Sequence, residues 1–196
     1  MAADTETLAN QLRSIVRSSD WMMRVLATIR ASELPEAWVG AGALRDLVWG
    51  QLYGSGFDPA AVRDIDVPYF DPDDLSRDRD DRATALLGGI WPRLPWEARN
   101  QAAVHTWYDR KFGGEPVQPL RSIVEAIGTW PETATAVAVR LDRSGEIEIC
   151  APCGLDDLLG GVWRRIPTRV TVERSQERLA RHRPAERWPT VTVVPP

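Results

Sequence analysis

The stretch that decides the fold is WVGAGALRD at residues 38–46, followed by DIDV at residues 64–67. Residues two apart on a β-strand project to the same face, so Asp64 and Asp66 point their carboxylates in one direction while the apolar residues between and after them face the core. Two like charges this close repel each other unless a divalent cation lies between them. Because the ligands would all be oxygen atoms, the pattern indicates Mg²⁺ or Mn²⁺.

The first stretch supplies a complement to these carboxylates. The turn Gly40-Ala41-Gly42 opens a segment, residues 43–52, whose apolar spacing is helical. Small residues at a helix N-terminus allow backbone N–H groups to approach phosphate oxygens, and the helix dipole assists. A phosphate cradle beside a carboxylate pair is equipment for phosphoryl or nucleotidyl transfer, in which metal ions neutralise a leaving pyrophosphate.

Composition excludes several other classes of function. The chain has 196 residues, 43% of them hydrophobic, and a net charge of −4, which predicts a single globular domain that does not coat DNA electrostatically. Lys111 is the only lysine among 24 basic residues, so Schiff-base and P-loop chemistry are disfavoured and anions must meet arginine or backbone N–H groups. No apolar run has the length of a membrane span. The N-terminus has no secretory pattern, so we expect a cytoplasmic protein without membrane contact.

The pattern along the chain predicts a single α+β domain, 1–196, built on a small mixed β-sheet that carries Asp64 and Asp66, with flanking helices mainly on the opposite face. Within it we expect an N-terminal helical region (1–34) that breaks near residues 18–20, a core (35–167), and a C-terminal helix and tail (168–196). Other expected elements are a helix whose first turn begins at Asp71-Pro72, a β-hairpin from 134–141 and 146–150, and helices over 154–165 and 172–183.

The two stretches, in this order, resemble the nucleotidyltransferase superfamily of DNA polymerase β and the CCA-adding enzymes, in which a glycine-containing turn precedes an Asp-x-Asp strand. Further blocks at residues 96–105, 130–140 and 151–158 are similar to those of a bacterial nucleotidyltransferase-like family. The resemblance extends from Trp38 to Pro189. It implies transfer of a nucleoside monophosphate from an NTP to a hydroxyl acceptor, which is an RNA, a protein or a small molecule.

The resemblance also implies roles for individual residues. Asp64 and Asp66 would bind Mg²⁺ or Mn²⁺, and Glu97, at the start of the next strand-like run, is the candidate third catalytic carboxylate and metal ligand. The nucleotide-binding positions would be Gly40, Ala41, Gly42 and Arg45. Ala41 replaces the first glycine of the superfamily's pair, and Arg45-Asp46 matches the Arg-Asp that follows the glycines in CCA-adding enzymes.

Several alternatives stay open at this point. The protein could be a non-catalytic nucleotide-binding or protein-interaction module that retains the fold, or a cysteine-dependent oxidoreductase using Cys150 and Cys153. Glu97 is equally compatible with a surface strand position, and Asp46 with an ion pair inside its helix. The polar residues Asn100, Gln101 and His105 are interpreted as groups that orient the strand. The arginine-rich segment 174–187 is more typical of a solvated helix face, although it is the best local basic patch for RNA or phosphate.

Overall fold

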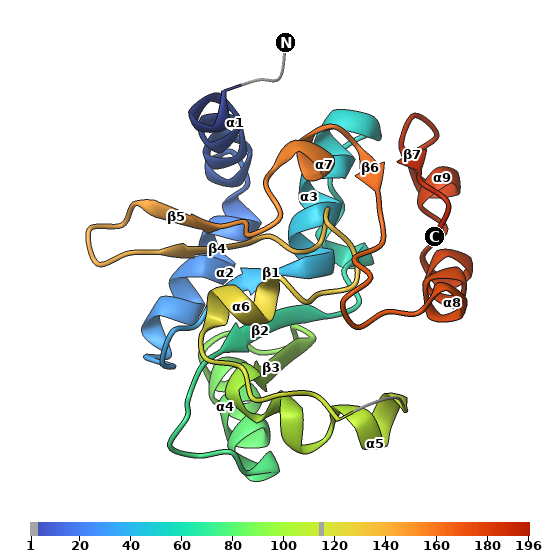
Figure 1. Ribbon diagram of the computed structural model, residues 1–196. Coiled ribbons are helices and arrows are strands. Elements are labelled where there is room, and N and C mark those ends of the chain that lie inside the picture. The colour runs from blue at the N-terminus through green and yellow to red at the C-terminus, as the bar shows by residue number, and fades with distance from the viewer. Residues whose placement is uncertain (1–3, 114–115) are drawn as a thin grey trace.

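The computed structural model describes residues 4–113 and 116–196 (Figure 1). In chain order its elements are α1 (Thr5–Arg17), α2 (Asp20–Ala31), β1 (Val39–Gly40), α3 (Ala41–Tyr53), η1 (Pro59–Ala61), β2 (Ile65–Tyr69), α4 (Arg77–Ile90), β3 (Trp96–Asn100), η2 (Gln101–Thr106), α5 (Tyr108–Phe112), α6 (Ile123–Ile127), β4 (Ala138–Leu141), β5 (Ile147–Cys150), α7 (Asp156–Leu159), β6 (Val162–Trp163), α8 (Val172–His182), α9 (Pro184–Arg187) and β7 (Thr192–Val193). Within the described ranges, no helix is long and apolar enough to cross a membrane.

The strands confirm the α+β class, with the sheet divided into small units. Strand β4 pairs antiparallel with both β1 and β5, whereas β2 pairs parallel with β3, and β6 pairs parallel with β7. The backbone N–H of Trp38, just before β1, donates to the carbonyl of Pro68 in β2 at 3.0 Å and so joins the first two units. In place of the one mixed sheet expected from the sequence, the described residues form an antiparallel sheet of three strands and two parallel pairs, and Asp66 lies on one of these pairs.

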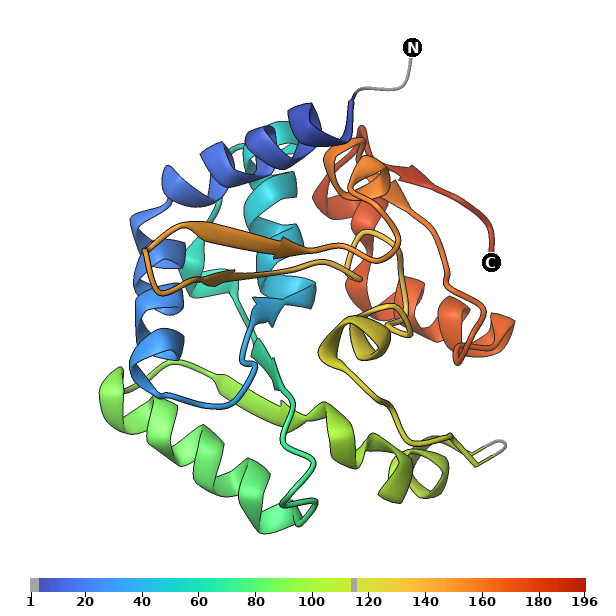
Figure 2. The same ribbon diagram turned by 60° about the vertical axis from the view of Figure 1, so that its left-hand side comes forward.

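The N-terminal helices form one wall of the core. Helices α1 and α2 break where the sequence predicts, and the Ser19 hydroxyl accepts the backbone N–H of Met22 at 3.2 Å, which caps α2. Their apolar faces bury Leu12, Val16 and Leu26, and α2 packs against β4 of the predicted hairpin (Figure 2). Helical spacing of apolar residues thus sufficed to define this part of the fold.

The parallel pair β2–β3 is joined by the crossover helix α4, which packs on β3. In this register Asp66 lies opposite Glu97, and partners on adjacent parallel strands project to the same face. On the other side the buried Tyr69 hydroxyl donates to the buried Asp80 of α4 at 2.7 Å. One face of the pair is thereby anchored to α4, and the other carries acidic side chains.

The predicted helix start at Asp71-Pro72 is wrong, because α4 begins only at Arg77. The intervening loop makes its own turns: Asp71 accepts the N–H of Asp73, and Asp74 accepts the N–H of Ser76. Carboxylates that bond local backbone N–H groups favour turns over helix.

The helix expected over 154–165 is also wrong. Helix α7 covers only Asp156–Leu159, and the chain turns at Gly161, whose φ of 66° lies in the left-handed region, before forming strand β6. A side chain at Gly161 would meet the Tyr53 ring at 2.8 Å, so the turn also needs a glycine for space.

The C-terminal segment returns to the core. Figure 1 places α8, α9 and β7 on the side of the molecule away from the β4–β5 hairpin. The buried Trp188 packs edge-on against Trp49 of α3, with ring centroids 5.1 Å apart. The main hydrophobic cluster therefore includes residues from the N-terminal helices, the central strands and the C-terminal tail.

We expect Trp188→Ala to lower the free energy of unfolding by about 3–5 kcal/mol, because it removes a buried ring and leaves a cavity against Trp49. The half-exposed Leu52→Ala serves as the control and should cost less than about 1 kcal/mol. Urea denaturation of both variants measures the difference. Equal losses would show that the C-terminal segment adds little to the core.

Candidate active site

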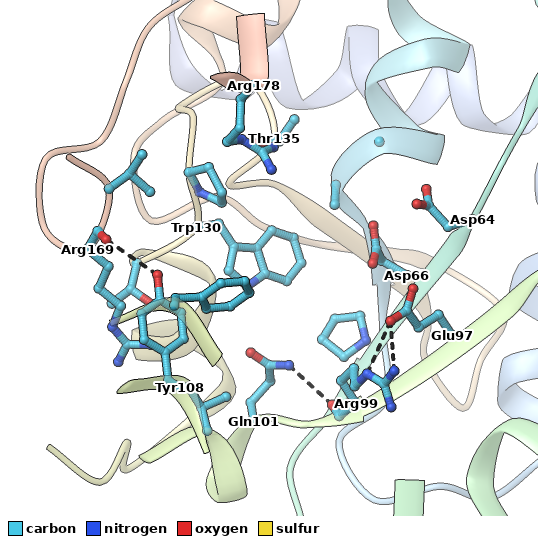
Figure 3. A pocket seen from close by; sticks show the side chains of 18 of the residues that line it. Asp64, Asp66, Glu97, Arg99, Gln101, Tyr108, Trp130, Thr135, Arg169 and Arg178 are labelled. Atoms are coloured by element: carbon cyan, nitrogen blue, oxygen red, sulfur yellow. Dashed lines mark hydrogen bonds and ion pairs between the residues drawn. The ribbon is translucent and has the colours of Figure 1, made fainter. Parts of the chain in front are cut away.

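Three predicted carboxylates lie together in the structure. Asp64 directly precedes β2, Asp66 is the second residue of that strand, and Glu97 is its partner on β3. All three line one cavity of about 310 Å³, called here the inner cavity, and they lie side by side in Figure 3. The carboxylates of Asp64 and Asp66 therefore face a cavity rather than open solvent.

Asp66 is the most perturbed of these groups. Burial, followed by the negative charges of Asp64 and Glu97, raises the pKa of Asp66 from 3.8 to about 7, although Arg178 and the backbone N–H of Gly42 oppose the shift. A buried carboxylate beside two others is stabilised in its charged form by a nearby positive charge. The chemistry of this oxygen-only donor set fits a divalent cation, which Asp64 and Asp66 could hold.

Glu97 is partly engaged elsewhere. Its carboxylate accepts hydrogen bonds from the Arg99 guanidinium, at 2.8 Å and 3.2 Å. Among the described residues, no group of three or more His, Cys, Asp or Glu side chains is arranged so that it could hold a metal ion. Glu97 therefore shares the cavity with the two aspartates without closing a three-ligand cluster.

The turn before α3 lies beside these carboxylates. A Cβ atom at Gly42 would come 3.8 Å from Asp64 Oδ1, and Ala41 and Gly42 both line the inner cavity. The first N–H groups of a helix have no intrahelical partner; in α3 that of Ala41 donates to the Val137 carbonyl at 3.4 Å, and that of Gly42 is directed to Asp66. Gly40 does not line the cavity, because it packs inward, where a Cβ would lie 2.5 Å from the Val137 carbonyl oxygen.

Arg45 also reaches the inner cavity, in a fixed position. Only 2% of its side chain is exposed, and two of its nitrogens donate to Asp46 Oδ1 at 2.9 Å and 2.6 Å. Its guanidinium carbon lies 5.3–5.8 Å from the ring centroids of Trp49, Trp163 and Trp188. Asp46 binds Arg187 as well, so the structural interpretation of Asp46 as an ion-pair residue is confirmed.

The structure adds site residues that the sequence analysis missed. Arg178 of α8 forms a two-pronged ion pair with Glu132, whose side chain is 1% exposed and also accepts the Thr135 hydroxyl. Arg178 and Thr135 both line the inner cavity. A buried carboxylate held this way fixes the arginine, and with it the position of α8.

The expectation that the arginine-rich segment is a solvated face is therefore wrong for one side of α8. Arg174, Arg178 and Arg181 line the inner cavity, and spacings of four and three place them along one helix face. That spacing was visible in the sequence. The sequence did not indicate, however, that this helix face lies opposite the strand that carries Asp66.

Aromatic side chains complete the inner cavity. Figure 3 shows Trp130 between the carboxylates and Tyr108. Asn100 has the orienting role predicted for it, because its side chain bonds the carbonyls of Asp71 and Asp74 and ties β3 to the loop before α4. Gln101 lines the cavity and donates to the Arg99 carbonyl at 3.2 Å.

The site thus combines a parallel strand pair that presents carboxylates, a helix N-terminus beside them and arginines opposite. A family model described as nucleotidyltransferase matches residues 27–193. The chain therefore belongs to this nucleotidyltransferase family, as the sequence resemblance indicated.

Solved structures agree with the family. The chain is 29% identical to a structure described as a CCA-adding enzyme head domain, with a TM-score of 0.79 and coverage of 95% of this chain and 96% of that one. A CCA-adding enzyme in complex with CTP matches at 16% identity and a TM-score of 0.56, over 97% of this chain but 43% of that enzyme. The second likeness shows the fold alone. No curated protein matches the chain significantly.

The raised pKa of Asp66 predicts a pH-dependent stability. Because the folded state holds this proton more tightly than the unfolded chain, stability without metal should fall as pH rises from about 4 to about 7, by roughly 2–4 kcal/mol. Asp66→Asn should remove this fall, so that the variant is the more stable protein at pH 8. Denaturation series in a chelating buffer measure the effect, with the exposed Asp73→Asn as control. Identical pH profiles for wild type and Asp66→Asn would contradict the assignment.

The backbone conformation of Ala41 predicts that a change to glycine, which usually destabilises a helix, does not destabilise the protein at this position. Its φ of 52° is left-handed, which costs a residue with a side chain about 1–2 kcal/mol relative to glycine. Ala41→Gly should therefore be neutral or stabilise the protein by up to about 1 kcal/mol. The control Ala43→Gly, two residues into the same helix, should destabilise it by about 1 kcal/mol. Thermal melting distinguishes the pair, and equal losses would rule out strain at Ala41.

Proposed function

We propose that the protein is a metal-dependent nucleotidyltransferase, which transfers a nucleoside monophosphate from an NTP to a hydroxyl acceptor. The observation that carries the proposal is that Asp64, Asp66 and Glu97 line the same cavity as the first turn of α3. The family supports nucleotidyl transfer in general. Metal dependence, the use of NTPs and the residue roles are our proposals, and a cytoplasmic location stays a prediction.

Asp64 and Asp66 would hold Mg²⁺ or Mn²⁺, whose charge would balance the triphosphate and the charge that develops during transfer. Two protein elements would bind the phosphates: the N-terminus of α3 at Gly42, and Arg178 and Arg181 of α8. The NTP is suggested by the CTP bound to the structurally similar CCA-adding enzyme. Three acidic and several basic side chains in one cavity suit a ligand that carries negative charge and brings cations with it.

The reaction itself exchanges one phosphorus–oxygen bond for another. The acceptor oxygen bonds to the α-phosphorus, and the bond from that phosphorus to the oxygen bridging it to the β-phosphate breaks. Pyrophosphate leaves with the electron pair, and the hydroxyl proton passes to Glu97. For this role the Glu97 carboxylate must be released, at least in part, from Arg99.

Two observations favour a second candidate, a nucleotide-binding module without activity: Glu97 is paired with Arg99, and the carboxylates close no metal cluster among the described residues. Such a module would bind NTP without releasing pyrophosphate. The cysteine alternative has less support, because burial raises the pKa of Cys150 to about 11 and also raises that of Cys153. A reactive cysteine needs a lowered pKa.

The test is Asp64→Asn, which removes one metal-binding charge at nearly constant volume. We expect pyrophosphate release to fall at least about 100-fold while the melting temperature stays within a few degrees. The assay supplies Mg²⁺, the four NTPs and a cell extract as the source of acceptor. The double variant Cys150→Ser, Cys153→Ser should keep its activity. Wild-type protein that binds NTP but never releases pyrophosphate would instead support the non-catalytic module.

A further inference from the structure

A second cavity of about 880 Å³, called here the outer cavity, adjoins the inner one. The two share six lining residues, among them Tyr108, Arg169 and Arg174. Neither Asp64 nor Asp66 lines the outer cavity. The molecule thus has a compartment next to the proposed reaction centre, yet separate from its carboxylates.

Two arginine–aromatic pairs lie at the junction, the place where the two cavities meet. The guanidinium carbon of Arg174 lies 3.6 Å from the centroid of the Phe112 ring, and that of Arg169 lies 5.4 Å from the centroid of Tyr108. The two rings pack edge to face, 4.8 Å apart. Stacking occupies the flat face of a guanidinium and leaves its N–H edge directed outward.

Those N–H edges have no acceptor within residues 4–113 and 116–196, where the side chains of Arg169 and Arg174 form neither a hydrogen bond nor an ion pair. Burial lowers the pKa of Arg169, and nearby Tyr108 and Glu125 offset only part of this shift, so its charge is partly desolvated and has no hydrogen-bonded partner among the described residues. A desolvated charge without a partner is costly. The arrangement is typical of arginines that bind a planar or tetrahedral anion from a ligand.

Three carboxylates of the described residues also line this cavity, but they do not accept hydrogen bonds from Arg169 or Arg174. Glu125 accepts the backbone N–H of Arg121 at 2.8 Å. The pKa of Glu173 is lowered by hydrogen bonds from its own backbone and from Thr171 at the start of α8. Glu177 lies one turn further along α8 and also lines the cavity. Glu125 and Glu173 are thus hydrogen-bonded within their own segments, and within residues 4–113 and 116–196 no carboxylate forms an ion pair with Arg169 or Arg174.

The position of the junction favours the acceptor over the NTP. In Figure 3, Arg169 and Tyr108 lie on the far side of Trp130 from Asp66 and Glu97. The phosphates of an NTP held at Gly42 would be at the carboxylate end of the cavity, where Arg178 is already the facing arginine. A second molecule is needed to occupy the other end.

We propose that the acceptor binds across the two cavities and that Arg169 and Arg174 bind an anionic group on it, a phosphate or a carboxylate. This rests on the proposed function, since the acceptor hydroxyl must reach the α-phosphorus in the inner cavity. The outer cavity accommodates the body of the acceptor. The anion is carried by a small hydroxyl compound or by the end of an RNA chain.

The acceptor class can be tested by fractionating a cell extract before the reaction. A deproteinised extract is passed over an anion exchanger at neutral pH, and each fraction is incubated with protein, Mg²⁺ and α-labelled NTPs. We expect label to be transferred to compounds in the retained fractions and not to those in the flow-through. Ribonuclease treatment of each retained fraction then distinguishes an RNA end, which is destroyed, from a small molecule, which survives.

The arginines are tested with Arg169→Gln, Arg174→Gln and the double variant, with the exposed hairpin residue Arg143→Gln as matched control. The double variant should lower kcat/KM for the retained acceptor by about 10-fold or more. Its affinity for labelled NTP, measured by equilibrium dialysis, should stay within about twofold. The single variants provide the same comparison if the double variant melts early.

The outcomes separate the two proposals. Transfer to flow-through compounds, or an equal loss of NTP affinity in the double variant, would overturn the anionic-acceptor proposal and leave nucleotidyl transfer standing. Failure of transfer with every fraction would overturn the acceptor proposal, and failure with the whole, untreated extract as well would contradict the proposed function. Retained acceptors whose kcat/KM is unchanged in the double variant would show that these arginines do not bind the anion.

Discussion

The in-register pairing of β2 with β3 is the constraint on which the site depends. It sets Asp66 opposite Glu97, two residues after Asp64, so that three negative charges share one cavity wall. Burial of Asp66 and, after it, repulsion from the other two carboxylates oppose folding, and the cost is visible in the raised pKa of Asp66. The tight crossover through α4, anchored by Tyr69 and Asp80, holds the strands in this costly register.

The rest of the molecule compensates for that charge from the opposite side. Helix α8 brings arginines to the cavity and is held there by the buried pair of Arg178 with Glu132. A second chain of contacts, from Arg187 through Asp46 to Arg45, ties α9 to α3. The C-terminal segment is therefore part of the site as well as part of the core.

Local pattern predicted the elements whose cause is local. The helical apolar spacing of α1 and α2, the hairpin, and the same-face projection of Asp64 and Asp66 follow from periods of 3.6 and 2 residues. Pattern failed where short-range hydrogen bonding or space decided the backbone. The carboxylates of Asp71 and Asp74 hold turns instead of a helix, and the glycine at 161 ends α7 where a longer helix was expected.

The amino-acid sequence by itself determined the family, the turn into α3 and the alignment of two carboxylates, because each depends on residues close together in the chain. Tertiary structure alone decided that Glu97 faces Asp66, that Gly40 packs inward while Gly42 meets the cavity, and that Trp130 and Arg178 complete the walls. The physical reason is distance along the chain. Contacts between residues many tens of positions apart depend on how packed elements meet, which no local period encodes.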